Sequence, residues 1–95
     1  MSYPVNRPMP LAAAPVTARL TLSIVPSGPG AGLADPGAEL IVNDAPSLAA
    51  ANGDNAIWSA PLAALVAGTA VDLGTTSNGL VVSAIPPGVA LLVDF

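Results

Sequence analysis

The chain has 95 residues, of which 53% are hydrophobic and 8% are charged, and its formal net charge is −4 at pH 7. It contains no lysine, histidine or cysteine, which excludes disulfide bonds, thiolate or imidazole metal ligands and histidine-based acid–base catalysis. Its two arginines are too few to neutralise the phosphates that drive nucleic-acid binding. A chain of this length forms one domain, and the low charge predicts that other protein covers much of its surface.

Residues 1–15 carry four prolines, at positions 4, 8, 10 and 15. Proline fixes its own φ and pushes the preceding residue toward extended backbone, so this segment is predicted to be an extended N-terminal arm. Two interpretations remain open, a loose terminus or an arm that lies across a neighbouring subunit. In the second interpretation the partner-contacting residues are Tyr3, Val5, Arg7, Met9 and Leu11.

Residues 16–25 give the clearest strand signal, because apolar and polar side chains alternate along them with a period of two. Arg19 falls on the polar face of this strand and is a candidate for a salt bridge across an interface, the alternative being a solvated side chain. Pro26 ends the strand. Residues 26–37 are rich in Gly and Pro and lack the Gly-Lys-Ser/Thr of a phosphate-binding loop, which predicts a surface loop.

The middle of the chain alternates short strands with turns. Residues 39–43 and 56–58 read as strands, and residues 47–51 read as one helical turn. Residues 61–67 fit either a short helix that begins at its proline or a strand. Trp58 can fill the centre of the core or anchor a contact with a partner, and both interpretations stay open.

The last third of the chain shows the strongest β pattern, with expected strands at 70–76, 80–85 and 89–95. Asn78-Gly79 favours a tight hairpin between the first two of these strands. Pro86-Pro87-Gly88 predicts a reverse turn between the last two. The three strands together are therefore expected to form a meander.

About six short strands with turns at regular spacing predict an all-β fold, a small antiparallel sandwich or barrel of the jelly-roll kind. The expected organisation is an extended Pro-rich arm over residues 1–15 and a single β domain over residues 16–95. The uncharged stretches 55–71 and 74–93 are interrupted by polar residues, Pro and Gly, so neither is expected to span a membrane. The first residues lack the pattern of a signal peptide, and we expect synthesis and use without Sec export.

We predict that the protein is not an enzyme and has no catalytic, cofactor-binding or metal site. Its serines and threonines have no histidine or lysine to take their protons, and no Gly-x-Ser-x-Gly elbow occurs. Its carboxylates stand singly, and those of Asp35, Asp44 and Asp54 are expected to brace loops by hydrogen bonds. The run 52–55 offers oxygen atoms but lacks the spacing of a calcium-binding loop.

In its size, its composition and its apolar arm from Tyr3 to Pro15, the chain resembles the small decoration, or cement, proteins of tailed-phage capsids. The resemblance implies a compact β-rich protein, often trimeric, that docks on a shell through extended arms and reinforces it. It further implies a virion protein assembled in the host cytoplasm, with the major capsid protein or another virion protein as its partner. The expected function is therefore non-enzymatic stabilisation of a capsid shell through the arm, Arg19 and apolar β surfaces, as a homo-oligomer that binds neither nucleic acid nor membrane.

Two other classes of function remain open. A small ligand- or glycan-binding β module would expose aromatic and polar side chains around a pocket, and the chain has only three aromatic residues to do so. A self-assembling filament subunit would use the same apolar strands for contacts between copies.

Overall fold

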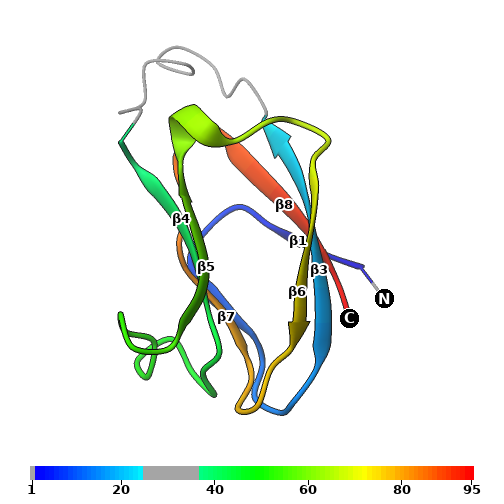
Figure 1. Ribbon diagram of the computed structural model, residues 1–95, viewed down its shortest axis with the longest axis vertical. Coiled ribbons are helices and arrows are strands. Elements are labelled where there is room, and N and C mark those ends of the chain that lie inside the picture. Colours follow the sequence, from blue (N-terminus) through cyan, green and yellow to red (C-terminus); the bar gives the residue numbers. More distant parts are fainter. Residues whose placement is uncertain (1, 25–36) are drawn as a thin grey trace.

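The alternating sequence of the β segments produces a two-layered sandwich, which a computed structural model describes for residues 2–24 and 37–95. Over these residues the strands form two antiparallel four-stranded sheets, so the expected all-β sandwich is confirmed (Figure 1). Sheet A has the order β1-β8-β3-β6 and sheet B the order β2-β7-β4-β5. The elements are β1 (Ser2–Val5), β2 (Met9–Ala12), β3 (Thr17–Ile24), β4 (Glu39–Asn43), β5 (Ala56–Pro61), the 3₁₀ turn η1 (Leu62–Ala64), β6 (Ala70–Thr75), β7 (Leu80–Ala84) and β8 (Val89–Asp94).

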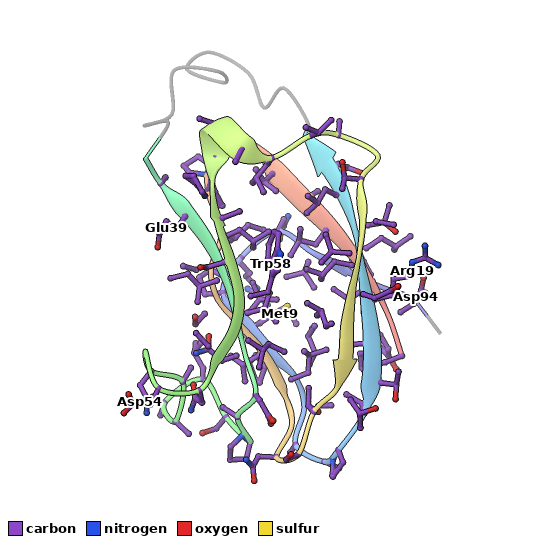
Figure 2. All side chains as sticks on the ribbon, in the orientation of Figure 1. Met9, Arg19, Glu39, Asp54, Trp58 and Asp94 are labelled. Carbon is purple, nitrogen blue, oxygen red and sulfur yellow. The ribbon has the colours of Figure 1, made fainter. Side chains whose placement is uncertain are left out.

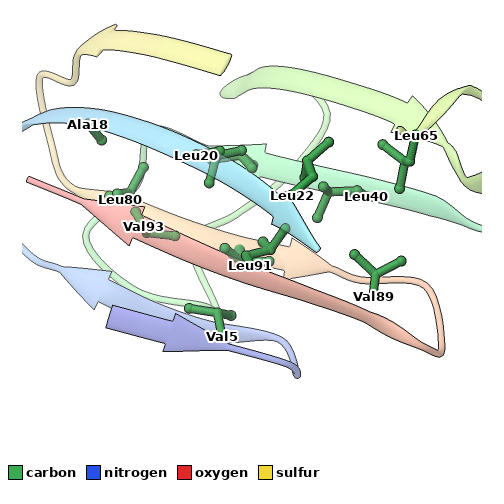
Figure 3. Close-up of a cluster of buried hydrophobic side chains, with 12 residues drawn as sticks. Val5, Ala18, Leu20, Leu22, Leu40, Leu65, Leu80, Val89, Leu91 and Val93 are labelled. Atoms are coloured by element: carbon green, nitrogen blue, oxygen red, sulfur yellow. The ribbon is translucent and has the colours of Figure 1, made fainter. Parts of the chain in front are cut away.

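The core lies between the two sheets and consists of leucine and valine side chains (Figure 3). On β3, Leu20 and Leu22 are buried while the intervening Thr21 is turned outward, as the period of two predicts. Burying a leucine or valine side chain of this kind stabilises the fold by about 1.5–3 kcal/mol. The core residues are Val5, Ala18, Leu20, Leu22, Leu40, Val42, Leu65, Leu80, Val82, Val89, Leu91 and Val93.

The meander expected for the last third of the chain is wrong. β6 and β8 belong to sheet A, whereas β7 between them belongs to sheet B, so both turns cross from one sheet to the other. The two-residue hairpin turn favoured by Asn-Gly needs a positive φ at both central residues, and Asn78 does not have one. The run Leu80–Val82 is buried on both faces, which places β7 in the middle of a sheet.

The proline-containing segment at the start of the chain is extended, and over residues 2–12 it belongs to the sandwich. β1 pairs with β8 at one edge of sheet A, and β2 pairs with β7 at one edge of sheet B. Pro4 and Pro10 lie in these two strands, and edge strands tolerate proline because one side of the strand has no ladder to complete. Residues 16–95 therefore supply only part of each sheet. The boundary expected at residue 15, between an arm and a β domain, does not separate residues 2–12 from the sandwich.

In the middle of the chain, the structure gives the conformation of residues 61–67 and the position of Trp58, which the sequence left open. Leu62–Ala64 form a 3₁₀ turn rather than a longer helix or a strand. Trp58 is half-buried and packs against the core, and it lies between the two sheets (Figure 2). Residues 47–51 form consecutive turns, in which the amide of Ala50 meets the carbonyl of Ser47 at 3.2 Å. The loop expected over 26–37 lies, apart from Gly37, outside the described residues, and so does Asp35.

Candidate functional site

The outer face of sheet B carries a groove of about 370 Å³, open to solvent. Its floor is the outer face of β4, where Glu39, Ile41 and Asn43 follow one another at a spacing of two residues. Part of the loop that joins β4 to β5 covers one end of the groove. The other lining residues are Ser59 and Ala56 of β5, Ser83 of β7 and Ala51, Asn52 and Gly53 of the covering loop.

Hydrogen bonds among three asparagines hold the covering loop, residues 44–55, against β4. The side-chain amide of the buried Asn43 donates to the carbonyl of Asn52 and to Oδ1 of Asn55, both at 2.8 Å. The hydroxyl of Ser83 in turn donates to Oδ1 of Asn43. Because both donors and the acceptor of Asn43 have partners, this buried amide stabilises the loop rather than weakening the fold.

The same hydrogen bonds occupy the oxygens that a calcium ion would need. Oδ1 of Asn55 accepts from the backbone amide of Asn52 at 2.9 Å as well as from Asn43. Oδ1 of Asn52 accepts from the backbone amide of Asp54 at 2.8 Å. Within the part of the chain that the structure describes, no cluster of acidic side chains suited to a metal ion occurs.

Asp44, the first residue of the covering loop, connects that loop to the turn between β6 and β7. Its carboxylate accepts hydrogen bonds from the backbone amides of Ser77 at 2.8 Å and Asn78 at 2.7 Å, and a longer one from Gly79 at 3.3 Å. The bonds from Ser77 and Asn78 are the main cause of the lowered pKa of Asp44; desolvation opposes them, and the Gly79 bond contributes least. Asp44 thus braces a loop as expected, but the loop is 33 residues away along the chain.

Gly79 completes this end of the sandwich because no larger residue fits there. A Cβ atom at this position would overlap the carbonyl oxygens of Ala12 and Ala45, and the φ of Gly79 is 151°. The close approach brings β2, the covering loop and β7 together at one point. The sequence Asn78-Gly79 predicts a hairpin turn. In the structure its glycine is needed for the close approach of these backbone segments instead.

Glu39 is the charged residue of the groove lining, and no ion pair of Glu39 occurs among the residues described. Its side chain projects from the outer side of sheet B, far from the positive charge of Arg19 (Figure 2). Ser59 lies on the neighbouring strand directly opposite Ile41, and it is exposed. The groove therefore combines a carboxylate, a free hydroxyl and a small aliphatic floor.

The outer face of sheet A carries Arg19, one of the two arginines predicted to contact a partner. Arg19 lies opposite Asp94 on β8 and opposite Asp72 on β6, and its Nε approaches the Asp72 carboxylate at 3.4 Å. The pair is largely exposed, so it adds little to stability. Leu92, two residues before Asp94 on the same face of β8, is 40% exposed. Arg19 thus forms its salt bridge within the chain.

The predicted contact residues of the N-terminal segment separate into two groups. Val5 is buried in the core, and Met9 and Leu11 are half-buried against it. Tyr3 and Arg7 are exposed, and the Tyr3 ring stacks on Phe95 with ring centroids 4.9 Å apart. Of the five, the structure leaves Tyr3 and Arg7 at the surface.

Sequence reasoning missed Glu39, Asn43 and Ser83 as residues of one site. Alternation along β4 places Glu39 and Asn43 on one face, and that signal was readable. The contribution of Ser83 follows from the pairing of β4 with β7, which joins segments about 40 residues apart. Large apolar side chains also remain at the surface, and they are Tyr3, Leu48, Ile57, Val66 and Leu92.

Comparison of the chain with protein-family models, with curated proteins and with solved structures gives no significant match. Among the described residues no helix is long and apolar enough to cross a membrane. The candidate function consequently rests on the surface and the groove.

Proposed function

We propose that the protein is a non-enzymatic structural component that joins a larger protein assembly through the outer surfaces of its sandwich. The observation that carries the proposal is the set of exposed aliphatic side chains on a surface with few charges. Val66 is 64% exposed, and Ile57 and Leu92 are each 40% exposed. Surfaces of this kind gain free energy when another protein covers them.

The assembly that we propose is a virion, with the major capsid protein or another virion protein as the partner. The support is the resemblance in size and composition to capsid decoration proteins, together with the edges of the sandwich. β5 and β6 are edge strands with no further strand beside them in the described chain. β5 has a bulge at Ile57, and β6 has a bulge at Leu73. Bulges discourage indefinite edge-to-edge pairing between strands and suit a defined contact.

A glycan-binding role receives less support. Sugar-binding grooves use exposed aromatic rings, whereas Trp58 is turned toward the core and Tyr3 stacks on Phe95. The groove on sheet B is lined by aliphatic and small polar residues.

The test is co-sedimentation of the purified protein with empty shells assembled from any major capsid protein that is encoded beside its gene. We expect saturable binding, and we expect an aspartate at the docking surface to weaken it about tenfold or more, because burying an unpaired charge is costly. The three variants are Ile57→Asp, Val66→Asp and Leu92→Asp. Ala49→Asp, at an exposed small residue outside the N-terminal arm, is the matched control.

Three outcomes contradict the proposal. They are the absence of a capsid gene beside this one, shells that do not bind the protein, and shells that bind all three variants as tightly as the control.

A further inference from the structure

We propose that the groove on sheet B binds the guanidinium of Arg7 from a second copy of the chain. The inference deepens the proposed assembly role and rests on it, because it names one contact by which copies join. It starts from two unpaired opposite charges, Glu39 in the groove and Arg7 in the connection between β1 and β2. Among the residues described, the ion pair found joins Arg19 and Asp72 and involves neither of them.

The chemistry of the groove fits an arginine side chain. A guanidinium presents five N–H donors in a planar fork and bonds a carboxylate through two of them. Glu39 supplies that carboxylate, and the exposed hydroxyl of Ser59 lies on the adjacent strand as a further acceptor. The aliphatic stem of an arginine would cover Ile41 and Ala56 on the floor.

The groove offers few free donors, which argues for a cation over a neutral or anionic ligand. Both donors of the Asn43 amide bond the covering loop, and the Ser83 hydroxyl bonds Asn43. The remaining charge of the lining is negative, and the whole chain carries −4. The negative charge therefore attracts a positively charged group to the groove, and the groove offers hydrogen-bond acceptors to bind it.

Charge complementarity within the chain identifies the occupant. The chain has two cations, and Arg19 faces the carboxylates of Asp72 and Asp94 on its own sheet. Arg7 is exposed and stands at the edge of sheet B formed by β2, whereas the groove lies over β7, β4 and β5. Copies can therefore pair reciprocally across a two-fold axis or head-to-tail, and either arrangement joins Arg7 of one copy to Glu39 of another.

The first experiment tests the groove alone. N-acetyl-arginine amide is titrated into the ¹⁵N-labelled protein, with N-acetyl-citrulline amide as the uncharged probe of the same shape. We expect saturable shifts at the amides of Glu39, Ile41 and Ser59 with a Kd on the order of millimolar, and none with citrulline. Glu39→Gln should weaken binding about tenfold or more, and Asp54→Asn, an equal charge change outside the lining, less than about twofold. Equal binding of both probes, or binding unaffected by Glu39→Gln, would overturn the assignment.

The second experiment tests the source of the arginine by sedimentation velocity over a range of protein and salt concentrations. We expect wild-type protein to associate and high salt to weaken the association. Arg7→Glu and Glu39→Arg should each abolish it, and the double variant should restore it, since the pair is then reversed. A mixture of Arg7→Gln and Glu39→Gln proteins should stop at heterodimers, because only one complementary contact is left.

Self-association of Arg7→Gln that equals that of wild type, or a double variant that stays monomeric, would overturn the second-copy contact. Shell binding separates this failure from failure of the proposed function. A protein that binds shells but shows no dependence on Arg7 or Glu39 contradicts the groove contact alone.

Discussion

The outer faces of the two sheets differ although both are built from strands with alternating side chains. On sheet A the outward residues stay in solvent, and Leu92 and the Arg19–Asp72 pair are exposed there. On sheet B the outward Asn43 and Val81 are buried. On sheet B, residues 44–55 bond to Asn43 through Asn52 and Asn55, and part of this loop lines one end of the groove. A strand face is therefore exposed or partly covered according to the loop that follows one of its strands.

The largest effect is expected where the covering loop meets the end of the sandwich. Gly79→Ala places a Cβ against the carbonyls of Ala12 and Ala45 at an unfavourable φ, and these two costs add. We expect a loss of about 3 kcal/mol or more in the free energy of unfolding, measured by urea denaturation. Gly53→Ala, where a Cβ meets open space, should change it by less than about 0.5 kcal/mol. Similar losses for both variants would contradict the packing described.

A second pair of variants compares the two faces directly. Val81 and Leu92 both point away from the core, but Val81 is fully buried and Leu92 is 40% exposed. Val81→Ala should cost about 2 kcal/mol because it removes buried methyl groups and leaves a cavity. Leu92→Ala should cost less than about 1 kcal/mol despite the larger truncation. Denaturation midpoints in the reverse order would contradict the burial of Val81 and the exposure of Leu92.

Asn43→Ala removes the side chain that ties the covering loop to β4. We expect a loss of about 1–2 kcal/mol, because the bonds to Asn52 and Asn55 disappear in a buried setting. Amide hydrogen exchange at residues 50–55 should accelerate in this variant, while exchange along β3 changes only through global unfolding. Asn6→Ala, at an exposed asparagine, serves as the control. Unchanged exchange in the loop would contradict the role given to Asn43.

The smallest effect concerns pH. The pKa of Asp44 is lowered by the amides of Ser77 and Asn78, so its ionised form stabilises the folded state. This contribution is present above the pKa of the unfolded chain, about 3.9, and is lost as pH falls through the lower folded value. In thermal melts, the melting temperature of wild type should exceed that of Asp44→Asn at neutral pH. The difference between the two melting temperatures should disappear in strong acid. A difference in melting temperature that stays constant down to pH 2 would count against this account. So would an equal difference between wild type and Asp54→Asn.

Much of the fold followed from local patterns. Residues 39–43 are a strand with the predicted bounds, and Leu20 and Leu22 lie inward as the alternation indicates. These predictions succeeded because side-chain direction in a strand is a local property with a period of two. The sheet to which each strand belongs was not predictable in this way. Asn78-Gly79 is compatible with a hairpin in isolation, and only the pairing of β6 with β3 and of β7 with β4 shows that the turn crosses between sheets.

By itself the sequence determined the class of fold, the apolar character of the surface and the poverty of catalytic side chains, because composition and periodicity act residue by residue. Only the tertiary structure decided that residues 2–12 complete both sheets and that Glu39, Ser59 and Ser83 line one groove. It also decided that Val81 is buried while Leu92 is exposed. The physical reason is that strand pairing and loop covering join residues far apart along the chain, and no local propensity encodes those contacts.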